Sequence, residues 1–384
     1  MMKRNLCQTG LRGLMSDTEH SFIYWNCSFV IRLSLIPTTF FAFVLLFSKF
    51  SYACTVFSFQ EGSRTFVANN LDWNSGQGVL IVNGRAVQKT AVFVQDQQPL
   101  QWVSQYKSVT FVHVGRDFPW EGMNEAGLSA DVLVLKSSQF PNADDPRPAI
   151  SGTQWLQYIL DTSGTVDAAI EHAEAAKVTA PWAHAHYFIC DALGQCAIFE
   201  YIDGALQIHR TGRNLPFFAL ANTSYDRSVE YLHHLVSTSN NREILDSPSS
   251  SSLDRFSRAA LWSQGFESDH ASDPVRYAFE GLRNVAQEST QWSIVFDLES
   301  RLIYFKTRQA PAVKTVNVNK FDPTCSSGAL VFDVNSPQAG DVTSLFQDYT
   351  PATDYQLLER NSNVPPASRK IIENYPQKHT ACRS

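Results

Sequence analysis

The chain has 384 residues, with 31 Lys and Arg against 37 Asp and Glu and a formal net charge of −6. An acidic chain without a run of basic residues is a poor match for nucleic acid or an anionic membrane surface, so neither is expected as a partner. The length suits one large domain or two small ones, with ample apolar material for a core.

The chain opens with a segment that resembles an export signal. Residues 33–47 (LSLIPTTFFAFVLLF) are apolar over the length of a signal-peptide core, which is short for a membrane span. Small residues, Ser51 and Ala53, occupy the −3 and −1 positions of a peptidase site. We therefore predict cleavage directly before Cys54 and a periplasmic or secreted protein. An uncleaved membrane anchor and a lipoprotein modified at Cys54 are the alternatives; lipoproteins usually carry an aliphatic residue at −3.

Five cysteines remain after this cleavage: Cys54, Cys190, Cys196, Cys325 and Cys382. An odd number in an oxidising compartment favours one free thiol, and Cys54 is the candidate. Cys190 and Cys196 bracket a turn between two strand-like runs, so a disulfide across a hairpin is plausible, whereas pairing of Cys325 with Cys382 is open. No CxxC or other zinc spacing occurs, and neither a metal nor a cofactor is expected.

The remaining chain alternates between groups of strands and groups of helices. β-branched and aromatic runs predict strands at TVFSF, TFVAN, GVLIVN, AVFV, VTFVHV and GLSADVLVL, and later at HAHYFIC, CAIFEYI, ALQIHR, QWSIVFDL and RLIYFKT. Helical spacing predicts two helices within 152–177 and others at Tyr225–Leu235, Leu253–Gly265 and Pro274–Gln287. Grouped elements of this kind favour layered α+β architecture.

Two polar stretches interrupt this pattern. STSNNREILDSPSSSS is expected to be a flexible surface loop, and the segment 351–384 a polar, partly disordered tail. The predicted organisation is a removed leader over 1–53, one domain over 54–350, and the tail.

A cysteine at the first position of a mature chain carries its own base. The α-amino group has a pKa of about 8 and a free thiol one of about 8.5, so the amine can accept the thiol proton near neutrality. The thiolate can then attack an acyl carbon and form an acyl-enzyme. A carboxylate to hold the ammonium is needed, and Asp72 in NNLDW could return beside Cys54 across a hairpin. Taken alone, Asp72 would be read as a turn or cap residue.

From Cys54 onward the sequence resembles the choloylglycine hydrolase and penicillin V acylase family. The resemblance rests on CTVFSF, NNLDW, WEGMNEAGLSADVLV, GTQWLQYILDTSGTVDAAIEHA, HYFICDALGQCAIFEY, ALANTSYD, LDRFSRAALW and TQWSIVFDLESRLIYF, which follow in order over most of the chain. It implies an N-terminal-nucleophile hydrolase with an αββα sandwich of two antiparallel sheets between helical layers.

The resemblance also implies roles for individual residues. Cys54 matches the nucleophile and Asp72 the aspartate that holds its α-amino group. Asn222 matches an asparagine of the oxyanion hole, and Arg255 an arginine near the nucleophile. Without the resemblance, Asn222 would be read as a turn residue and Arg255 as a solvated helix charge.

Two positions depart from the family pattern. Relatives usually carry an arginine where this chain has Asn69, so the thiolate should be less stabilised or depend on Arg255 alone. Where relatives place an Asn or Tyr in the oxyanion hole, this chain has Val134. Together with the aromatic residues Trp73 and Trp120, Val134 is a candidate for substrate binding.

The histidines offer two weaker hypotheses. His184 and His186, in HAH, have a spacing that metals sometimes use, but no third ligand is evident. A papain-like pair of Cys54 with His113, His184 or His186 lacks the flanking sequence typical of papain.

We therefore predict an exported cysteine amidase that hydrolyses a linear carboxamide with an apolar acyl group. Penicillin V and N-acyl homoserine lactones are the first substrates to test, and conjugated bile salts the alternative within the same fold. The alternative that is not an enzyme is a non-catalytic envelope lipoprotein anchored through Cys54. Tetramers are common among similar proteins, so the resemblance points to a homotetramer.

Overall fold

The computed structural model describes residues 54–179, 184–265, 273–361 and 364–382. The predicted leader and its peptidase site lie outside these residues, apart from Cys54. No helix in the described ranges is both long and apolar enough to cross a membrane.

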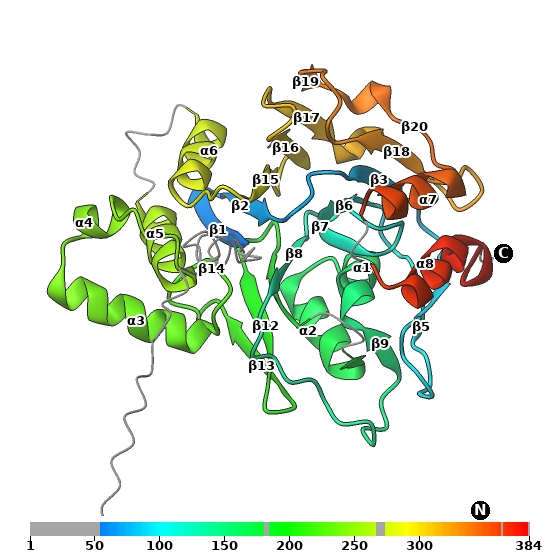
Figure 1. Cartoon of the computed structure of the whole chain (residues 1–384), viewed down its shortest axis with the longest axis horizontal. Helices are drawn as coiled ribbons and strands as arrows, with labels where there is room; N and C mark the ends of the chain where they lie inside the picture. Colours follow the sequence, from blue (N-terminus) through cyan, green and yellow to red (C-terminus); the bar gives the residue numbers. More distant parts are fainter. Residues whose placement is uncertain (1–53, 180–183, 266–272, 362–363, 383–384) are drawn as a thin grey trace, which may run out of the picture. The chain divides into compact units, whose positions relative to one another are not determined.

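Two β-sheets form the centre of the fold (Figure 1). The first has the order β14 (Ala219–Leu220), β1 (Thr55–Glu61), β2 (Arg64–Asp72), β15 (Thr290–Asp297), β16 (Leu302–Thr307), β17 (Lys314–Asn317) and β19 (Gly340–Asp341). The second has the order β13 (Ala205–Arg210), β12 (Cys196–Ile202), β11 (Ala185–Cys190), β8 (Ser129–Val134), β7 (Pro119–Asn124), β6 (Ser108–Val112), β3 (Val79–Asn83), β18 (Leu330–Asp333) and β20 (Gln347–Asp348). Every pairing is antiparallel except that of β17 with β19.

Helices cover the outer face of each sheet. The first sheet carries α5 (Ser252–Gln264) and α6 (Pro274–Asn284), which pack against β1 and β2, and α3 (Tyr225–Thr238) packs on α5. The second carries α1 (Gly152–Thr162) against β7 and β8, with α2 (Val166–Ala175) beside α1. Figure 1 shows this order of helices, sheet, sheet and helices. The predicted αββα sandwich of the α+β class is therefore confirmed.

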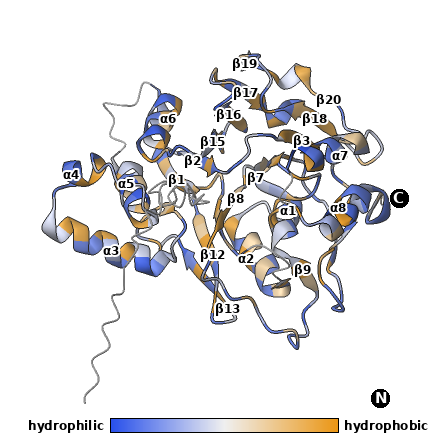
Figure 2. Ribbon diagram, viewed as in Figure 1, coloured by the Kyte–Doolittle hydropathy of each residue, from blue (hydrophilic) through white to orange (hydrophobic). Residues whose placement is uncertain are grey.

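The sandwich explains why β2 is buried on both faces. Eight of its nine residues are buried, because one face meets the second sheet and the other meets α6. The apolar core between the sheets includes Val56, Leu71, Phe111, Leu133 and Phe188. Figure 2 shows the hydrophobic residues along β8 in the interior and the largely hydrophilic surface of the outer helix α8 (Pro366–Lys378).

Most predicted elements are confirmed, and one predicted strand is wrong. AVFV at 91–94 is not a strand; the neighbouring β4 (Val87–Thr90) is, and it pairs with β5 (Gln101–Val103). The chain leaves the strand because Phe93 has a φ of 62° and the Gln154 side chain accepts the Val92 N–H. Another short parallel pair joins β9 (Ala149–Ser151) to β10 (Lys177–Thr179).

Two stretches expected to be irregular contain helices. The polar loop holds α4 (Asn241–Leu245), which begins with a capping box between Asn240 and Glu243. The segment after residue 350, expected to be partly disordered, forms α7 (Pro351–Arg360), α8 and β21 (Thr380–Cys382). Its docking depends on long-range contacts that local sequence does not reveal.

Two disulfides join four of the five described cysteines. Cys190 and Cys196 are register partners of β11 and β12 and are bonded, as the hairpin interpretation predicted. Cys325 and Cys382, whose pairing the sequence left open, form the second disulfide. Cys54 is the free cysteine among the described residues, and it is buried.

Candidate active site

Cys54 directly precedes β1 and faces the space between the sheets. Its relative exposure is 1%, and its neighbour Thr55 pairs with Asn70 of β2. This register brings Cys54 beside Asp72, whose backbone N–H bonds the sulfur. Burial, and next the charge of Asp72, raise the pKa of the Cys54 thiol well above its usual range. As long as Cys54 is joined to Ala53 by a peptide bond, its nitrogen is an amide and is not basic.

Asp72 ends β2 and is held by two side chains from beyond α6. Gln287 Nε2 donates to Asp72 Oδ2 at 2.7 Å, and the Thr290 hydroxyl donates to Oδ1. Burial raises the pKa of Asp72 to about 6, despite these bonds and the nearby guanidinium of Arg255. The carboxylate is thus oriented, and its charge acts on the Cys54 thiol. No local sequence pattern marks Gln287 or Thr290 as partners of Asp72.

Arg255, in the first turn of α5, connects Cys54 to Asn222. Its Nη1 donates to the Cys54 carbonyl at 2.8 Å and to the Thr55 hydroxyl, and its Nη2 donates to Asn222 Oδ1 at 3.0 Å. Arg255 is 1% exposed, and burial lowers its pKa to about 10, against the opposing effect of Asp72 and Cys54. The guanidinium remains charged at neutral pH and fixes three groups relative to one another.

Asn222 follows β14 and reaches across to the second sheet. Its Nδ2 donates to the Val134 carbonyl at 2.8 Å, which leaves the second amide proton for another acceptor. Val134 therefore contributes its carbonyl, which orients the Asn222 amide. The structure brings together Cys54, Asp72, Asn222 and Arg255, the four residues that the resemblance matched.

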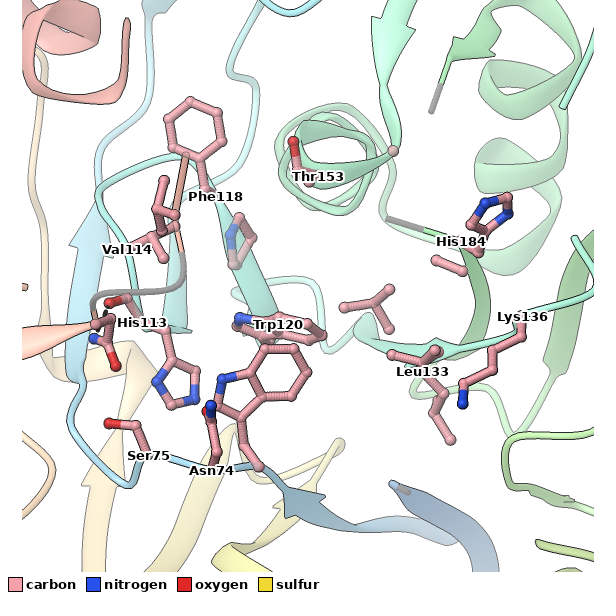
Figure 3. Close-up of a pocket in the computed structure, with 18 of the residues that line it drawn as sticks. Asn74, Ser75, His113, Val114, Phe118, Trp120, Leu133, Lys136, Thr153 and His184 are labelled. Atoms are coloured by element: carbon pink, nitrogen blue, oxygen red, sulfur yellow. Dashed lines mark hydrogen bonds between the residues drawn. The ribbon is translucent and has the colours of Figure 1, made fainter. Parts of the chain in front are cut away.

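A cavity of about 580 Å³ adjoins this cluster. Trp73 and Trp120 line it with their ring centroids 4.6 Å apart, and Val134 lines it as well. Figure 3 shows Val114 and Phe118 at one side of the pocket and Leu133 and Lys136 at the other, with Trp120 between them. The remaining wall residues are Asn74, Ser75, His113, Pro119, Val132, Gly152, Thr153, His184, Ala185, Arg360, Asn361 and Val364.

Asn69 lies in an acidic part of the core between the sheets. Its Nδ2 donates to Asp131 Oδ1 at 2.7 Å, and Asp131 pairs across β7 and β8 with Glu121. Among the described residues, both Glu121 oxygens, Asp131 Oδ2 and Asn69 Oδ1 have no hydrogen-bond partner. Burial, followed by the neighbouring charge of Asp131, raises the pKa of Glu121 well above its usual range, and burial raises that of Asp131 to about 7. Local sequence does not reveal this pair. The charge of Glu121 raises the pKa of the Cys54 thiol further.

The histidines considered earlier make other contacts. His186 Nδ1 lies 2.8 Å from Glu200 Oε1, and its Nε2 lies 2.6 Å from the Ala221 carbonyl. Both partners offer hydrogen-bond acceptors, and they hold the His186 ring between Glu200 and the turn that follows β14. His113 Nδ1 contacts the Gln77 carbonyl, and burial lowers the pKa of His113 to about 3. The described ranges contain no group of three side chains suited to a metal ion.

Glu200 positions the turn that carries Asn222. Besides His186, it accepts the Tyr225 N–H at 3.1 Å, and its pKa falls to about 2, where these hydrogen bonds outweigh the effect of burial. We expect Glu200→Gln to lower kcat about tenfold with little change in KM, because Asn222 would be held less firmly. Steady-state kinetics beside Asp226→Asn, whose side chain is 79% exposed, provides the check. An equal loss in both variants, or a change in KM alone, would contradict this role.

Known proteins of one family are similar to this chain in sequence and in fold. Residues 54–330 match the model of the linear amide C–N hydrolases, choloylglycine hydrolase family. A penicillin V acylase of Pectobacterium atrosepticum is 27% identical over 347 residues, covering 79% of this chain and 89% of the relative. The structure of penicillin V acylase from Agrobacterium tumefaciens superposes with a TM-score of 0.67 at 25% identity, covering 78% of this chain and 98% of that one.

A mutant of the conjugated bile acid hydrolase from Clostridium perfringens shares the fold, with a TM-score of 0.61 at 17% identity over 75% of this chain and 98% of that chain. The chain therefore belongs to the choloylglycine hydrolase family of linear amide C–N hydrolases.

Proposed function

We propose that the protein is an exported penicillin V acylase-like amidase whose nucleophile is the Cys54 thiol, freed by cleavage after Ala53. The observation that carries the proposal is the placement of a buried, unpaired thiol beside Asp72 and the linked pair Arg255 and Asn222. The α-amino group of Cys54 accepts the thiol proton, and Asp72 holds the resulting ammonium. A positive charge at this position offsets the burial of the thiolate.

In the proposed reaction the Cys54 sulfur attacks the amide carbon. The free amide proton of Asn222 stabilises the oxyanion, and the ammonium returns its proton to the leaving nitrogen as the C–N bond breaks. Water then attacks the thioester, with the amine as base, and releases a carboxylic acid and the thiol. Trp73 and Trp120 provide apolar surface for the acyl group.

The charges around the cavity favour penicillin V over acyl lactones. Lys136 and Arg360 line it, whereas none of the described residues on its wall is an Asp or Glu. Penicillin V carries a carboxylate and an N-acyl homoserine lactone carries none, so the first should bind more tightly. Conjugated bile salts are anionic too and remain the second candidate class.

Lys136→Met should raise KM for penicillin V two- to fivefold, about the worth of one exposed ion pair, and leave a neutral phenoxyacetyl amide unaffected. Steady-state kinetics at low and high salt measures this, with Lys370→Met on α8 as the matched control. The substrate ranking is wrong if both substrates respond alike.

The first experiment on the whole proposal is the intact mass and N-terminal sequence of protein from an exporting host. A chain that starts at unmodified Cys54, and that reacts there with a thiol-directed acylating probe, is expected. A lipidated Cys54 would support the envelope lipoprotein instead, and an internal Cys54 would remove the base. The same sample tests periplasmic or secreted location by fractionation, and a homotetramer by light scattering.

A further inference from the structure

The C-terminal segment, defined here as the described residues 351–361 and 364–382, lies beyond the 54–330 match to the family. It is nonetheless built firmly into the domain. β21 pairs with β4, the Cys325–Cys382 disulfide closes its end, and the Tyr375 ring packs edge-on against Phe118 at 5.3 Å. Val364, Ile372 and Tyr375 share one apolar cluster with Phe118.

The loop that carries the cavity wall is shaped to receive this segment. A side chain at Gly115 would place its Cβ 2.6 Å from Ile372 Cγ2, so only glycine permits α8 to approach this closely. The Asn361 Nδ2 donates to the His113 carbonyl at 2.6 Å, and the His113 ring stacks on Trp292 at 4.2 Å. The segment is thus bonded to a residue that itself lines the cavity.

Two buried residues of the segment, Asn361 and Val364, form part of the cavity wall. Arg360 lines the cavity as well, but it also borders a second cavity near Asp333. Val364 is 6% exposed and belongs to the same apolar cluster as Phe118. Phe118 lies at the side of the pocket away from Leu133 (Figure 3). The opposite side is the reactive one, since the Val134 carbonyl accepts the Asn222 amide there.

We infer that the C-terminal segment is a specificity wall for the acyl group, and that Val364 limits how long an apolar acyl group can be. This inference rests on the proposed amidase function. An acyl group bonded to the Cys54 sulfur extends past Trp120 toward Phe118 and meets Val364. Aryl and alkyl acyl groups suit this end, because Val114, Phe118 and Val364 present apolar surface.

Val364→Trp tests the wall by filling the distal end of the cavity. Its kcat/KM should fall about tenfold for a phenoxyacetyl amide and less than about twofold for an acetyl amide of the same amine, since a pocket discriminates chiefly by the extra apolar group. Val364→Ala should favour acyl groups longer than phenoxyacetyl. Val236→Trp, on α3 and 42% exposed, is the matched control and should change neither rate.

Binding separates failure of this inference from failure of the amidase proposal. Phenoxyacetate should bind the Cys54→Ala protein, and adding Val364→Trp should weaken that binding about tenfold by calorimetry. If the wild-type protein hydrolyses no amide, the amidase proposal is wrong. The calorimetric affinities would still show whether Val364 limits the size of the acyl group that binds. The inference is wrong if Val364→Trp lowers kcat/KM equally for the phenoxyacetyl and acetyl amides. It is also wrong if the rates and the phenoxyacetate affinity stay unchanged.

Discussion

Cys54→Ser should lower kcat about 10⁴-fold or more, with phenoxyacetate affinity nearly unchanged. A serine hydroxyl has a far higher pKa than a thiol, and the amine proposed as base cannot deprotonate it effectively at neutral pH. Single-turnover hydrolysis of a phenoxyacetyl amide gives the rate, and calorimetry gives the affinity. Retained hydrolysis in the serine variant would mean that the nucleophile is another residue.

An extended form of this chain separates the role of the Cys54 thiol from that of its α-amino group. A chain with extra residues retained before Cys54 keeps the sulfur but has an amide at its nitrogen. It should lose about 10²–10⁴ in rate, the usual contribution of a general base, and should react slowly with a thiol probe. Its thiol keeps the raised pKa that burial and Asp72 impose. Full activity in the extended chain would rule out the α-amino base.

Asn69→Arg should make the free energy of unfolding less dependent on pH up to about pH 7 and increase the reactivity of Cys54. The raised pKa of Asp131 means that the folded state binds a proton more tightly than the unfolded state, so the free energy of unfolding falls as pH rises. Between pKa values of 3.8 and about 7, Asp131 alone can account for a loss of about 4 kcal/mol. A guanidinium at position 69 would pair with the ionised carboxylates and remove much of this loss.

Urea unfolding at pH 5 and pH 8 measures the stability difference, and the rate of thiol alkylation measures the reactivity of Cys54. Asn69→Met is the control, because its side chain is large but carries no charge. The electrostatic explanation fails if the methionine variant matches the arginine variant, or if wild-type stability is the same at both pH values.

The sequence carries most of the secondary structure, because its periodicity is local. Apolar runs mark β11 and β12, alternation marks β13, and the Ser-Gly break at 163–164 separates α1 from α2. It does not reveal the C-terminal segment, whose helices are polar outside and are held by Phe118, β4 and a disulfide to Cys325. The strand predicted at 91–94 fails for a similar reason, since a Gln154 side chain takes the Val92 N–H.

The candidate nucleophile and three neighbours could be named from the chain alone. Cys54 stands out by its place after a predicted peptidase site, and the resemblance identifies Asp72, Asn222 and Arg255 at positions where pattern alone indicates only turns and a helix charge. The groups that orient and tune them lie far away in the sequence. Gln287 holds Asp72 across 215 positions, and Asp131 meets Asn69 across 62. Burial and hydrogen bonding between distant strands decide those pairings and the pKa values that follow, so only the tertiary structure reveals them.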